Sequence, residues 1–370
     1  MPKKKSKIRS ITKLVLLWVN VMVSVLILYP QFFQPLSFIW VNGFLRLMLP
    51  YLMLIEFLLI ISWLVAKPIL ALIPIGTLMI GWQSLFVLFA WHPGGRFTPH
   101  KKAEYVRIAS WNIKEFNVNE SNLSQHKLRT EEIAYSNQKW NPDIICLQEY
   151  NTKELLGDPA NHATYFTKKY PYYFFSKDYT TKEPGYYAGC IIFSRYPIVD
   201  AKRIPFINGE SLIYTTLLRG DDTIRVYTTH LASYRFKEND FEPQQNSKEA
   251  LALKTNWNVV KKMKAAFVER AIQANLIQTQ LASSPYPSII TGDFNDVPSS
   301  YTYNTIKANW QDAFLKKGLG IGATYLGISP TLRIDYILPN QQWEVKGWES
   351  IDENLSDHHM ILSDLLLLKK

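Results

Sequence analysis

Three long apolar segments fill most of the first hundred residues, and they constrain the fold of the chain more than any other feature. They run over residues 11–29, 44–66 and 68–91. About 20 consecutive apolar residues are enough for a helix to cross the roughly 30 Å hydrocarbon core of a bilayer. The pattern therefore predicts three membrane-spanning helices in an N-terminal region of residues 1–92. It predicts a multi-pass membrane protein whose partner is the lipid bilayer.

The first apolar segment also fits a cleaved signal peptide, because the basic cluster Lys3–Lys13 overlaps its start. Two further apolar segments follow, and a small-residue cleavage site is missing, so a retained helix is the favoured interpretation. Positively charged flanks stay on the cytoplasmic side of a membrane. The basic cluster and Lys67 predict a cytoplasmic N-terminus, and three spans then place the C-terminal part outside the cytoplasm. Arg96, Lys101 and Lys102 favour the opposite orientation.

Glu56 is a carboxylate inside the second apolar segment. A charged residue at membrane depth is by default a candidate functional site. Nothing else in the sequence suggests a transport path. We therefore expect Glu56 to take part in packing between helices or to lie at the membrane interface.

The charge of the chain is concentrated in the same N-terminal region. Of the formal net charge of +10, residues 1–100 carry +8 and the remaining 270 residues carry +2. A basic domain is the electrostatic mark of nucleic-acid binding, but most of this excess flanks membrane segments. A content of 47% hydrophobic and 14% aromatic residues excludes intrinsic disorder. Cys146 and Cys190 are too few for a disulfide framework, and we expect both thiols to be buried.

After a linker at 93–104, short apolar runs alternate with polar helical stretches. The runs predict strands at 106–111, 143–148, 187–194, 212–218, 223–229, 288–291, 333–338 and 360–367. Helices are predicted at 123–140 and 256–281. Many strands with few long helices predict an α/β domain over 105–370, in which two packed sheets are flanked by helices. The polar stretch 235–254 is either an inserted cap or a solvated surface segment.

Polar residues stand at or near the ends of nearly all these strands. They are Asn112, Glu149, His230, Asp293, Asn295, Asp335, Asp357 and His358. Each alone is an ordinary turn residue or a satisfied histidine, but polar side chains at one rim of a sheet converge on a common cleft. The motifs of serine hydrolases, P-loop enzymes, dinucleotide enzymes and structural zinc sites are missing. Carboxylate and amide oxygens suit a hard cation, Mg²⁺ or Mn²⁺, and with an imidazole they provide what phosphoester hydrolysis needs.

Seven short motifs follow one another in this part of the chain. They are SWNIK (110–114), DIICLQE (143–149), IIFSRYPI (191–198), THL (229–231), GDFND (292–296), RIDYIL (333–338) and SDHH (356–359). Together they resemble the ordered motifs of the endonuclease/exonuclease/phosphatase (deoxyribonuclease-I-like) family over about residues 105–370. The resemblance implies a four-layer sandwich of two mixed sheets and helices. It also implies divalent-metal-dependent hydrolysis of phosphoesters. With the apolar N-terminal segments, the chain is expected to be a membrane-anchored member of the family.

The resemblance implies a metal site built from three of the polar residues. Glu149 corresponds to the principal ligand of the Mg²⁺ or Mn²⁺ ion, and Asn112 lies beside it, holding the metal-bound phosphate region. Asp357 is implied to lie near the ion, as a direct ligand or through water. Asn112 is in addition expected to bind substrate.

The other five residues are implied to carry the reaction. Asp293 aligns or deprotonates the attacking water, and Asn295 donates to the developing phosphorane oxygens. His358 contacts the scissile phosphate, and Asp335 orients its imidazole and raises the pKa of that ring. His230 contacts phosphate or protonates the leaving oxygen, so that His230 and Asn295 also bind substrate.

The motifs leave the substrate open between two classes. A nuclease needs a basic groove along the nucleic-acid backbone, which a domain charge of +2 does not indicate. A tethered phosphodiesterase or phosphatase acting on a phospholipid headgroup would be held near its substrate by the membrane helices. A third hypothesis, a catalytically silent binding module of the same fold, is disfavoured because the whole polar set is intact. No obligate protein partner is evident in the sequence.

Overall fold

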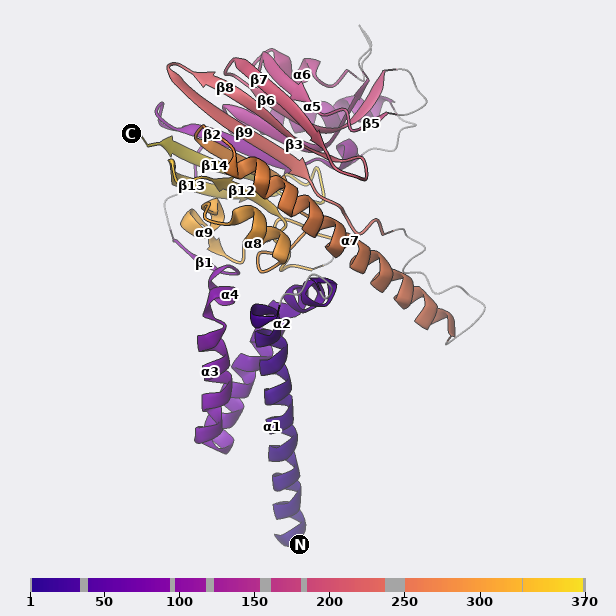
Figure 1. The fold of residues 1–370 in the computed structure, drawn as a ribbon, viewed down its shortest axis with the longest axis vertical. Helices are drawn as coiled ribbons and strands as arrows, with labels where there is room; N and C mark the ends of the chain where they lie inside the picture. The colour runs from indigo at the N-terminus through magenta and orange to yellow at the C-terminus, as the bar shows by residue number, and fades with distance from the viewer. Residues whose placement is uncertain are drawn as a thin grey trace. The chain divides into compact units, whose positions relative to one another are not determined.

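The computed structural model describes residues 2–33, 39–93, 97–117, 123–153, 161–180, 185–236, 250–327 and 329–368 (Figure 1). The chain divides into two compact units. The first comprises Met1–Leu88, Arg235–Val268 and Ser299–Tyr301, and the second comprises Phe89–Tyr234, Glu269–Pro298 and Thr302–Lys370. The first unit holds the apolar N-terminal helices, and the second holds both large sheets.

The N-terminal helices are α1 (Pro2–Phe32), α2 (Ile39–Ala66), α3 (Leu72–Ile80) and α4 (Trp82–Phe86), with the 3-10 turn η2 (Pro68–Ala71) before α3. Two of them, α1 from Ser10 onward and α2, are long and apolar enough to cross a membrane. Their bounds overlap the predicted segments 11–29 and 44–66. The helix α2 begins earlier than predicted and continues through Pro50, a residue that membrane helices tolerate.

The third predicted span, residues 68–91, is not a single long helix, so a third membrane-spanning helix is not confirmed. Its helical part is interrupted at Gly81, which separates the 9 residues of α3 from the 5 residues of α4. Ala90 and Trp91 form strand β1, which pairs with β11 (Leu319–Gly320) in the second unit. Apolar composition does not distinguish a short strand from a buried helical segment.

Glu56 is buried among the N-terminal helices. Its carboxylate accepts hydrogen bonds from Asn20 Nδ2 at 3.2 Å and from Ser24 Oγ at 2.9 Å, both on α1. Thr77 Oγ1 of α3 donates to the same serine hydroxyl at 2.8 Å. The carboxylate therefore joins three apolar segments through hydrogen bonds, which is the packing role expected for it.

The second unit contains a seven-stranded and a five-stranded mixed sheet. The larger sheet has the order β13 (Trp343–Ile351), β14 (Met360–Leu367), β2 (Val106–Asn112), β3 (Ile144–Lys153), β6 (Tyr186–Ser194), β4 (Tyr172–Phe175), with β5 (Tyr179–Thr180) also on β6. The smaller sheet has the order β12 (Asp335–Pro339), β10 (Ser288–Asp293), β9 (Asp222–His230), β8 (Ser211–Arg219), β7 (Ile198–Pro205). Only β2 with β3 and β9 with β10 run parallel among these pairs. The predicted α/β fold on mixed sheets is confirmed.

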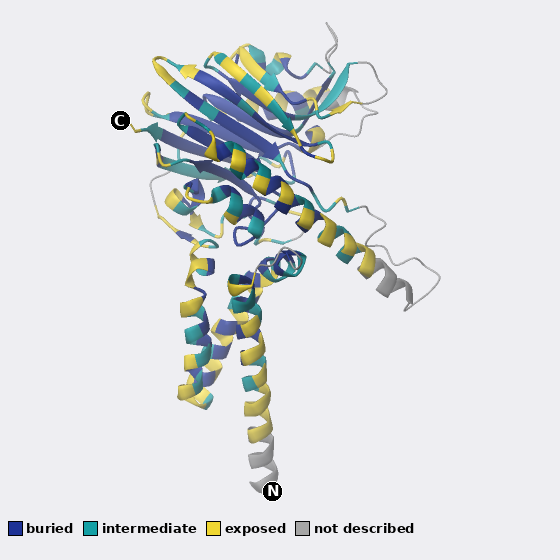
Figure 2. Ribbon diagram, viewed as in Figure 1, coloured by how far each residue is buried: buried dark blue, intermediate teal, exposed yellow. Residues whose placement is uncertain are grey.

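The two sheets pack face to face through one hydrophobic core. Ile108 of β2 and Ile144 of β3 meet Val226 of β9 and Ile289 of β10 in this core, together with both cysteines. Side chains alternate between the two faces of a strand, so each of these strands also presents a second face. Figure 2 shows that the central strands of the sheets are largely buried, as expected for strands covered on both sides.

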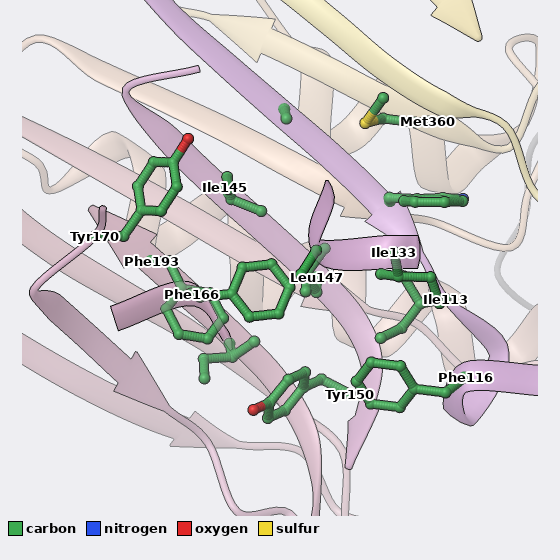
Figure 3. Close-up of a cluster of buried hydrophobic side chains, with 14 of the residues drawn as sticks. Ile113, Phe116, Ile133, Ile145, Leu147, Tyr150, Phe166, Tyr170, Phe193 and Met360 are labelled. Atoms are coloured by element: carbon green, nitrogen blue, oxygen red, sulfur yellow. The ribbon is translucent and has the colours of Figure 1, made fainter. Parts of the chain in front are cut away.

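The second face of the larger sheet packs against α5 (Leu123–Lys139) and α6 (Thr164–Thr167). Figure 3 shows Ile133 of α5 and Phe166 of α6 among Ile145, Leu147 and Phe193 of the sheet. On the smaller sheet, Tyr227 of β9 donates to a backbone carbonyl of α7 (Ala250–Ala282). The remaining helical elements are η3 (Lys114–Asn117), α8 (Tyr301–Lys307) and α9 (Ala313–Lys317). Helical elements thus accompany both sheets of the sandwich.

The predicted insertion 235–254 is described only in part. Residues 237–249 lie outside the described residues, and residues from 250 onward begin α7. The predicted helix 256–281 therefore lies within a longer helix of 33 residues.

Candidate active site

Three of the predicted site residues occupy one rung of the smaller sheet. Asp293 is the last residue of β10, and it pairs in register with His230, the last residue of β9. On its other side Asp293 pairs with Asp335, the first residue of β12. Sheet register therefore places an imidazole and two carboxylates next to one another without any contribution from a flexible loop.

Glu149 and Asn112 enter the same site from the larger sheet. Glu149 lies in an irregularity of β3, where the register to β6 shifts between Leu147 and Tyr150, and its φ is 51°. A bulge of this kind redirects a side chain at the edge of a sheet. Asn112 Nδ2 donates to Glu149 Oε1 at 3.0 Å and to Asp293 Oδ2 at 3.1 Å. This amide therefore connects the two sheets at the site.

His358 forms a buried pair with Asp335. Its Nδ1 lies 2.9 Å from Asp335 Oδ2, and its Nε2 lies 3.7 Å from Asp293 Oδ2. Burial alone would lower the pKa of the imidazole, but the carboxylates of Asp335 and Asp293 outweigh it and raise the pKa of His358 to about 10. The ring is thus held as an imidazolium at neutral pH, with Nε2 facing the interior of the site. The ring of Tyr325 lies 4.9 Å from it, centroid to centroid.

His230 faces Asp293 from the opposite direction. Its Nε2 lies 3.7 Å from Asp293 Oδ2, 3.5 Å from Glu149 Oε1 and 3.0 Å from Asn295 Nδ2. Its other nitrogen, Nδ1, lies 4.0 Å from Glu210 Oε1. Asn295 is fixed by a second hydrogen bond, from its Nδ2 to the carbonyl of Leu231 at 2.9 Å. Both histidines therefore have a carboxylate beside Nδ1 and direct Nε2 toward Asp293.

Asp357 is positioned differently from the other predicted ligands. Its Oδ2 forms an ion pair with Lys114 Nζ at 2.9 Å. The pKa of Lys114 is raised by the hydrogen bond to Asp357, against the lowering effect of burial. Lys114 is two residues after Asn112 and begins a run of three left-handed residues that ends at Phe116. An ammonium group thus pairs with the carboxylate that was expected to lie near the metal ion.

The donor set fits a hard divalent cation. Four carboxylates, those of Glu149, Asp293, Asp335 and Asp357, lie close to two imidazoles and the ammonium of Lys114. Asp335 Oδ1 is buried and has no hydrogen-bond partner among the described residues. Asp293, Asp335 and His358 also form a compact group, with one ligand atom from each within 4.8 Å of the others. Asp335 is already hydrogen-bonded to Nδ1 of the His358 ring. We therefore favour the position with oxygen ligands from Glu149 and Asn112 as the metal site.

The structure therefore brings seven of the eight predicted residues into one hydrogen-bonded or charge-paired cluster. Asp357 adjoins it through Lys114. Three neighbours were not predicted, namely Glu210, Tyr325 and Lys114. Lys114 lies inside the first motif, so its position was a usable signal. Glu210 stands in a connection before β8, and Tyr325 forms an isolated bridge with His358, and neither segment carries a strand pattern in the sequence.

A sequence model of the "Endonuclease/Exonuclease/phosphatase family" matches residues 109–358. The chain belongs to this family. The matched residues include the entire polar set from Asn112 to His358 and lie within the predicted catalytic region. Enzymes of this family generally hydrolyse phosphoester bonds with metal ions. No curated protein sequence matches the chain significantly.

Several solved structures are similar to the chain. An endonuclease/exonuclease/phosphatase from Beutenbergia cavernae is 19% identical, with 72% of each chain covered and a TM-score of 0.47. Truncated Caenorhabditis elegans TDP2 is 17% identical, covering 72% of this chain and 99% of that one, with a TM-score of 0.49. The human Nocturnin catalytic domain with bound sulfate is 18% identical, covering 72% and 94%, with a TM-score of 0.49.

Proposed function

We propose that the chain is a membrane-anchored, divalent-metal-dependent phosphoesterase that hydrolyses phosphodiester or phosphomonoester bonds by attack of water. The observation that carries the proposal is the convergence on Asp293. Its Oδ2 accepts a hydrogen bond from Asn112 and lies 3.7 Å from Nε2 of both His230 and His358. A carboxylate between two imidazoles, at the edge of a cation site, matches the requirements of phosphoryl transfer to water.

The metal ligands in this proposal are Glu149 and Asn112, with Asp357 nearby. A Mg²⁺ or Mn²⁺ ion bound there supplies a positive charge for the phosphoryl oxygens. Asp357 acts through Lys114 or through water, because its carboxylate is already paired with that ammonium. The oxygen-rich set disfavours zinc, which prefers nitrogen and sulfur.

The remaining residues move the proton and hold the phosphate. Asp293 aligns the attacking water and takes up its proton, while the water oxygen bonds to phosphorus and the bond to the leaving oxygen breaks. His358, charged and fixed by Asp335, donates from Nε2 to a phosphate oxygen. Asn295 keeps one amide hydrogen on the Leu231 carbonyl and donates the other to an oxygen that gains charge in the transition state. His230 contacts phosphate or protonates the leaving oxygen.

The N-terminal helices are proposed to anchor this site to a membrane. Two described helices have the length and apolarity to span a bilayer. A third crossing by the interrupted segment from Pro68 to Phe86, a cytoplasmic N-terminus and an extracytoplasmic catalytic region complete the proposed topology. Reporter fusions after residue 100 test it, because a reporter active only in the cytoplasm would contradict the orientation.

The substrate is proposed to be a nucleic acid or a phospholipid headgroup. The full-length protein in detergent, with Mg²⁺ or with EDTA, is given supercoiled plasmid, single-stranded RNA, sphingomyelin, phosphatidylinositol phosphates and a bis-aryl phosphodiester. We expect cleavage of at least one substrate that needs Mg²⁺ and falls by several orders of magnitude in Asp293→Ala.

The variant Asp200→Ala is the matched control, because Asp200 is an exposed carboxylate on β7 of the same sheet. Its activity should equal that of the wild type. Cleavage of plasmid or RNA alone would identify a nuclease, and cleavage of lipids alone would identify a lipid phosphoesterase. A folded protein inactive on the whole panel would favour the silent binding module instead.

A further inference from the structure

The short ribbon of β1 and β11 has an outward-facing apolar side. Trp91 pairs with Leu319 in its antiparallel register. Phe89 and Ile321 stand directly next to the ribbon, before β1 and after β11. Residues directly opposite each other share one face of an antiparallel pair, so Trp91 and Leu319 lie on one face, and the stacked rings place Phe89 beside Trp91. Ala90, between the two aromatic residues, points to the other side and is buried. We call Phe89, Trp91, Leu319 and Ile321 the apolar ribbon face.

The apolar ribbon face is open to solvent. The exposed fractions are 46% for Phe89, 72% for Trp91, 55% for Leu319 and 42% for Ile321. The two aromatic rings stack on each other, with centroids 6.0 Å apart. Single exposed apolar residues are common on protein surfaces, but a group on one face marks an interaction surface.

The chain preceding the ribbon indicates what covers it. Helix α4 ends at Phe86, three residues before Phe89, and no residue from Pro68 to Trp91 is charged. Three extended residues span at most about 11 Å, which is comparable with the polar layer of about 5–8 Å on each side of a bilayer core. The ribbon therefore cannot be far from the end of the apolar segment.

The residues around the ribbon have the composition of a membrane interface. Tryptophan and other aromatic side chains are enriched at the level of lipid headgroups. Lys316 and Lys317 are exposed in the last turn of α9, immediately before the second strand of the ribbon. Lysines near the surface are attracted to anionic lipids. Apolar aromatics beside lysines thus complement a bilayer surface in both polarity and charge.

We propose that the apolar ribbon face inserts into the interfacial layer of the bilayer, beside anionic phospholipid headgroups. The proposal rests on the proposed membrane anchoring and adds a second attachment, made by the catalytic unit itself. Burial of the four side chains removes from water an apolar surface that the second unit otherwise leaves uncovered.

Depth measurements by spin labelling test the proposal in the full-length protein. Ile321→Cys is labelled with a nitroxide and reconstituted into vesicles of phosphatidylcholine and phosphatidylglycerol. The native Cys146 and Cys190 are buried and remain unlabelled. Ile207→Cys is the matched control, because Ile207 lies in the same unit and is 87% exposed. Leu58→Cys on α2 reports the bilayer interior, and Leu319→Cys replaces the first variant if that one does not fold.

We expect the ratio of collisions with oxygen to collisions with a water-soluble nickel chelate to be several-fold higher at residue 321 than at residue 207. A ratio at residue 321 equal to that at residue 207, with a high ratio at residue 58, would overturn the ribbon proposal alone. A label at residue 321 shielded from both reagents would mean that protein covers the face, which also overturns it. A water-like ratio at residue 58 would overturn the membrane anchoring itself.

Discussion

Asp335 Oδ2 lies 2.9 Å from His358 Nδ1, and both side chains are buried. Asp335 is the first residue of β12, and His358 stands two residues before β14, where it forms an isolated bridge with Tyr325; β12 and β14 belong to different sheets. A carboxylate in this position fixes the ring orientation and keeps the proton on the ring.

Replacement of Asp335 by Asn should lower kcat by about 10²–10⁴-fold, because the imidazolium loses the charge that stabilises it. The pKa of His358 should fall at the same time, and NMR titration of the ring measures it. Asp352→Asn is the control, because Asp352 lies 3.9 Å from His359 outside the site. An Asp335→Asn enzyme with half of the wild-type activity would contradict the role of the pair.

Glu210 is expected to position His230 in the same manner but less strongly, because their separation of 4.0 Å is longer than a hydrogen bond. Glu210→Gln should lower kcat/KM by about 10–100-fold and shift the pH dependence that His230 controls. Glu210→Asp should recover part of the loss if orientation is its role. If Glu210→Gln lost activity but kept the wild-type pH profile, the role of Glu210 would be structural only.

Lys114 is expected to limit the binding of metal at Asp357. Its ammonium competes with a cation for the same carboxylate, so Lys114→Ala should bind Mn²⁺ more tightly than the wild type. The gain should remain below about tenfold, since the lysine is half exposed and such pairs contribute little. Equilibrium dialysis measures the affinity and the number of ions per chain, and weaker binding in the variant would refute the competition.

Gly292 is required by the strand pairing that positions Asp293. Its φ is 141°, and a Cβ there would lie 2.0 Å from the backbone oxygen of Thr229. Gly292→Ala should therefore destabilise the folded protein by about 3 kcal/mol or more. Gly220→Ala, in a turn where a Cβ has open space at φ 59°, should cost only about 1–2 kcal/mol. Denaturant titration measures the free energy of unfolding of both variants. A larger loss in Gly292→Ala would show that the contact with Thr229, rather than the positive φ, causes most of the destabilisation.

The two cysteines should be inert to thiol reagents in the folded protein. Both are buried, and burial raises the pKa of the Cys146 and Cys190 thiols above the ordinary value. The reactive thiolate is therefore scarcely populated at pH 8. Titration with a disulfide reagent should detect no thiol before unfolding and two after it, and rapid labelling of the native protein would contradict the burial.

The sequence predicted the strands that are mostly buried and missed strands in which many residues are accessible. The segment predicted as 106–111 corresponds to β2, and 223–229 lies within β9. In contrast, β7 and β13 were not predicted, because polar residues interrupt their alternation and much of each strand is accessible. Local pattern gives a clear signal only where both faces of a strand are buried.

The types of the site residues could be predicted from their places after strands, but their pairing could not. No local sequence pattern indicates that β10 lies between β9 and β12. The alignment of His230, Asp293 and Asp335 on one rung therefore depends on the pairing of strands that are distant in sequence. The bulge that directs Glu149 into the site could not be predicted either, because it is defined by the register of β3 with β6. Glu210 escaped prediction because it precedes β8 in a connection without periodicity.

The ribbon of β1 and β11 has a consequence for how the enzyme would meet its substrate. Ile321 is four residues from Tyr325, whose ring covers His358, and four extended residues reach at most about 14 Å. With the ribbon in the bilayer, the phosphate site stays at a short and nearly constant height above the lipid. Encounters with a membrane-borne substrate then occur by lateral diffusion in two dimensions. The turnover rate would follow the surface density of that substrate, so dilution with inert lipid would slow the enzyme even at constant total substrate.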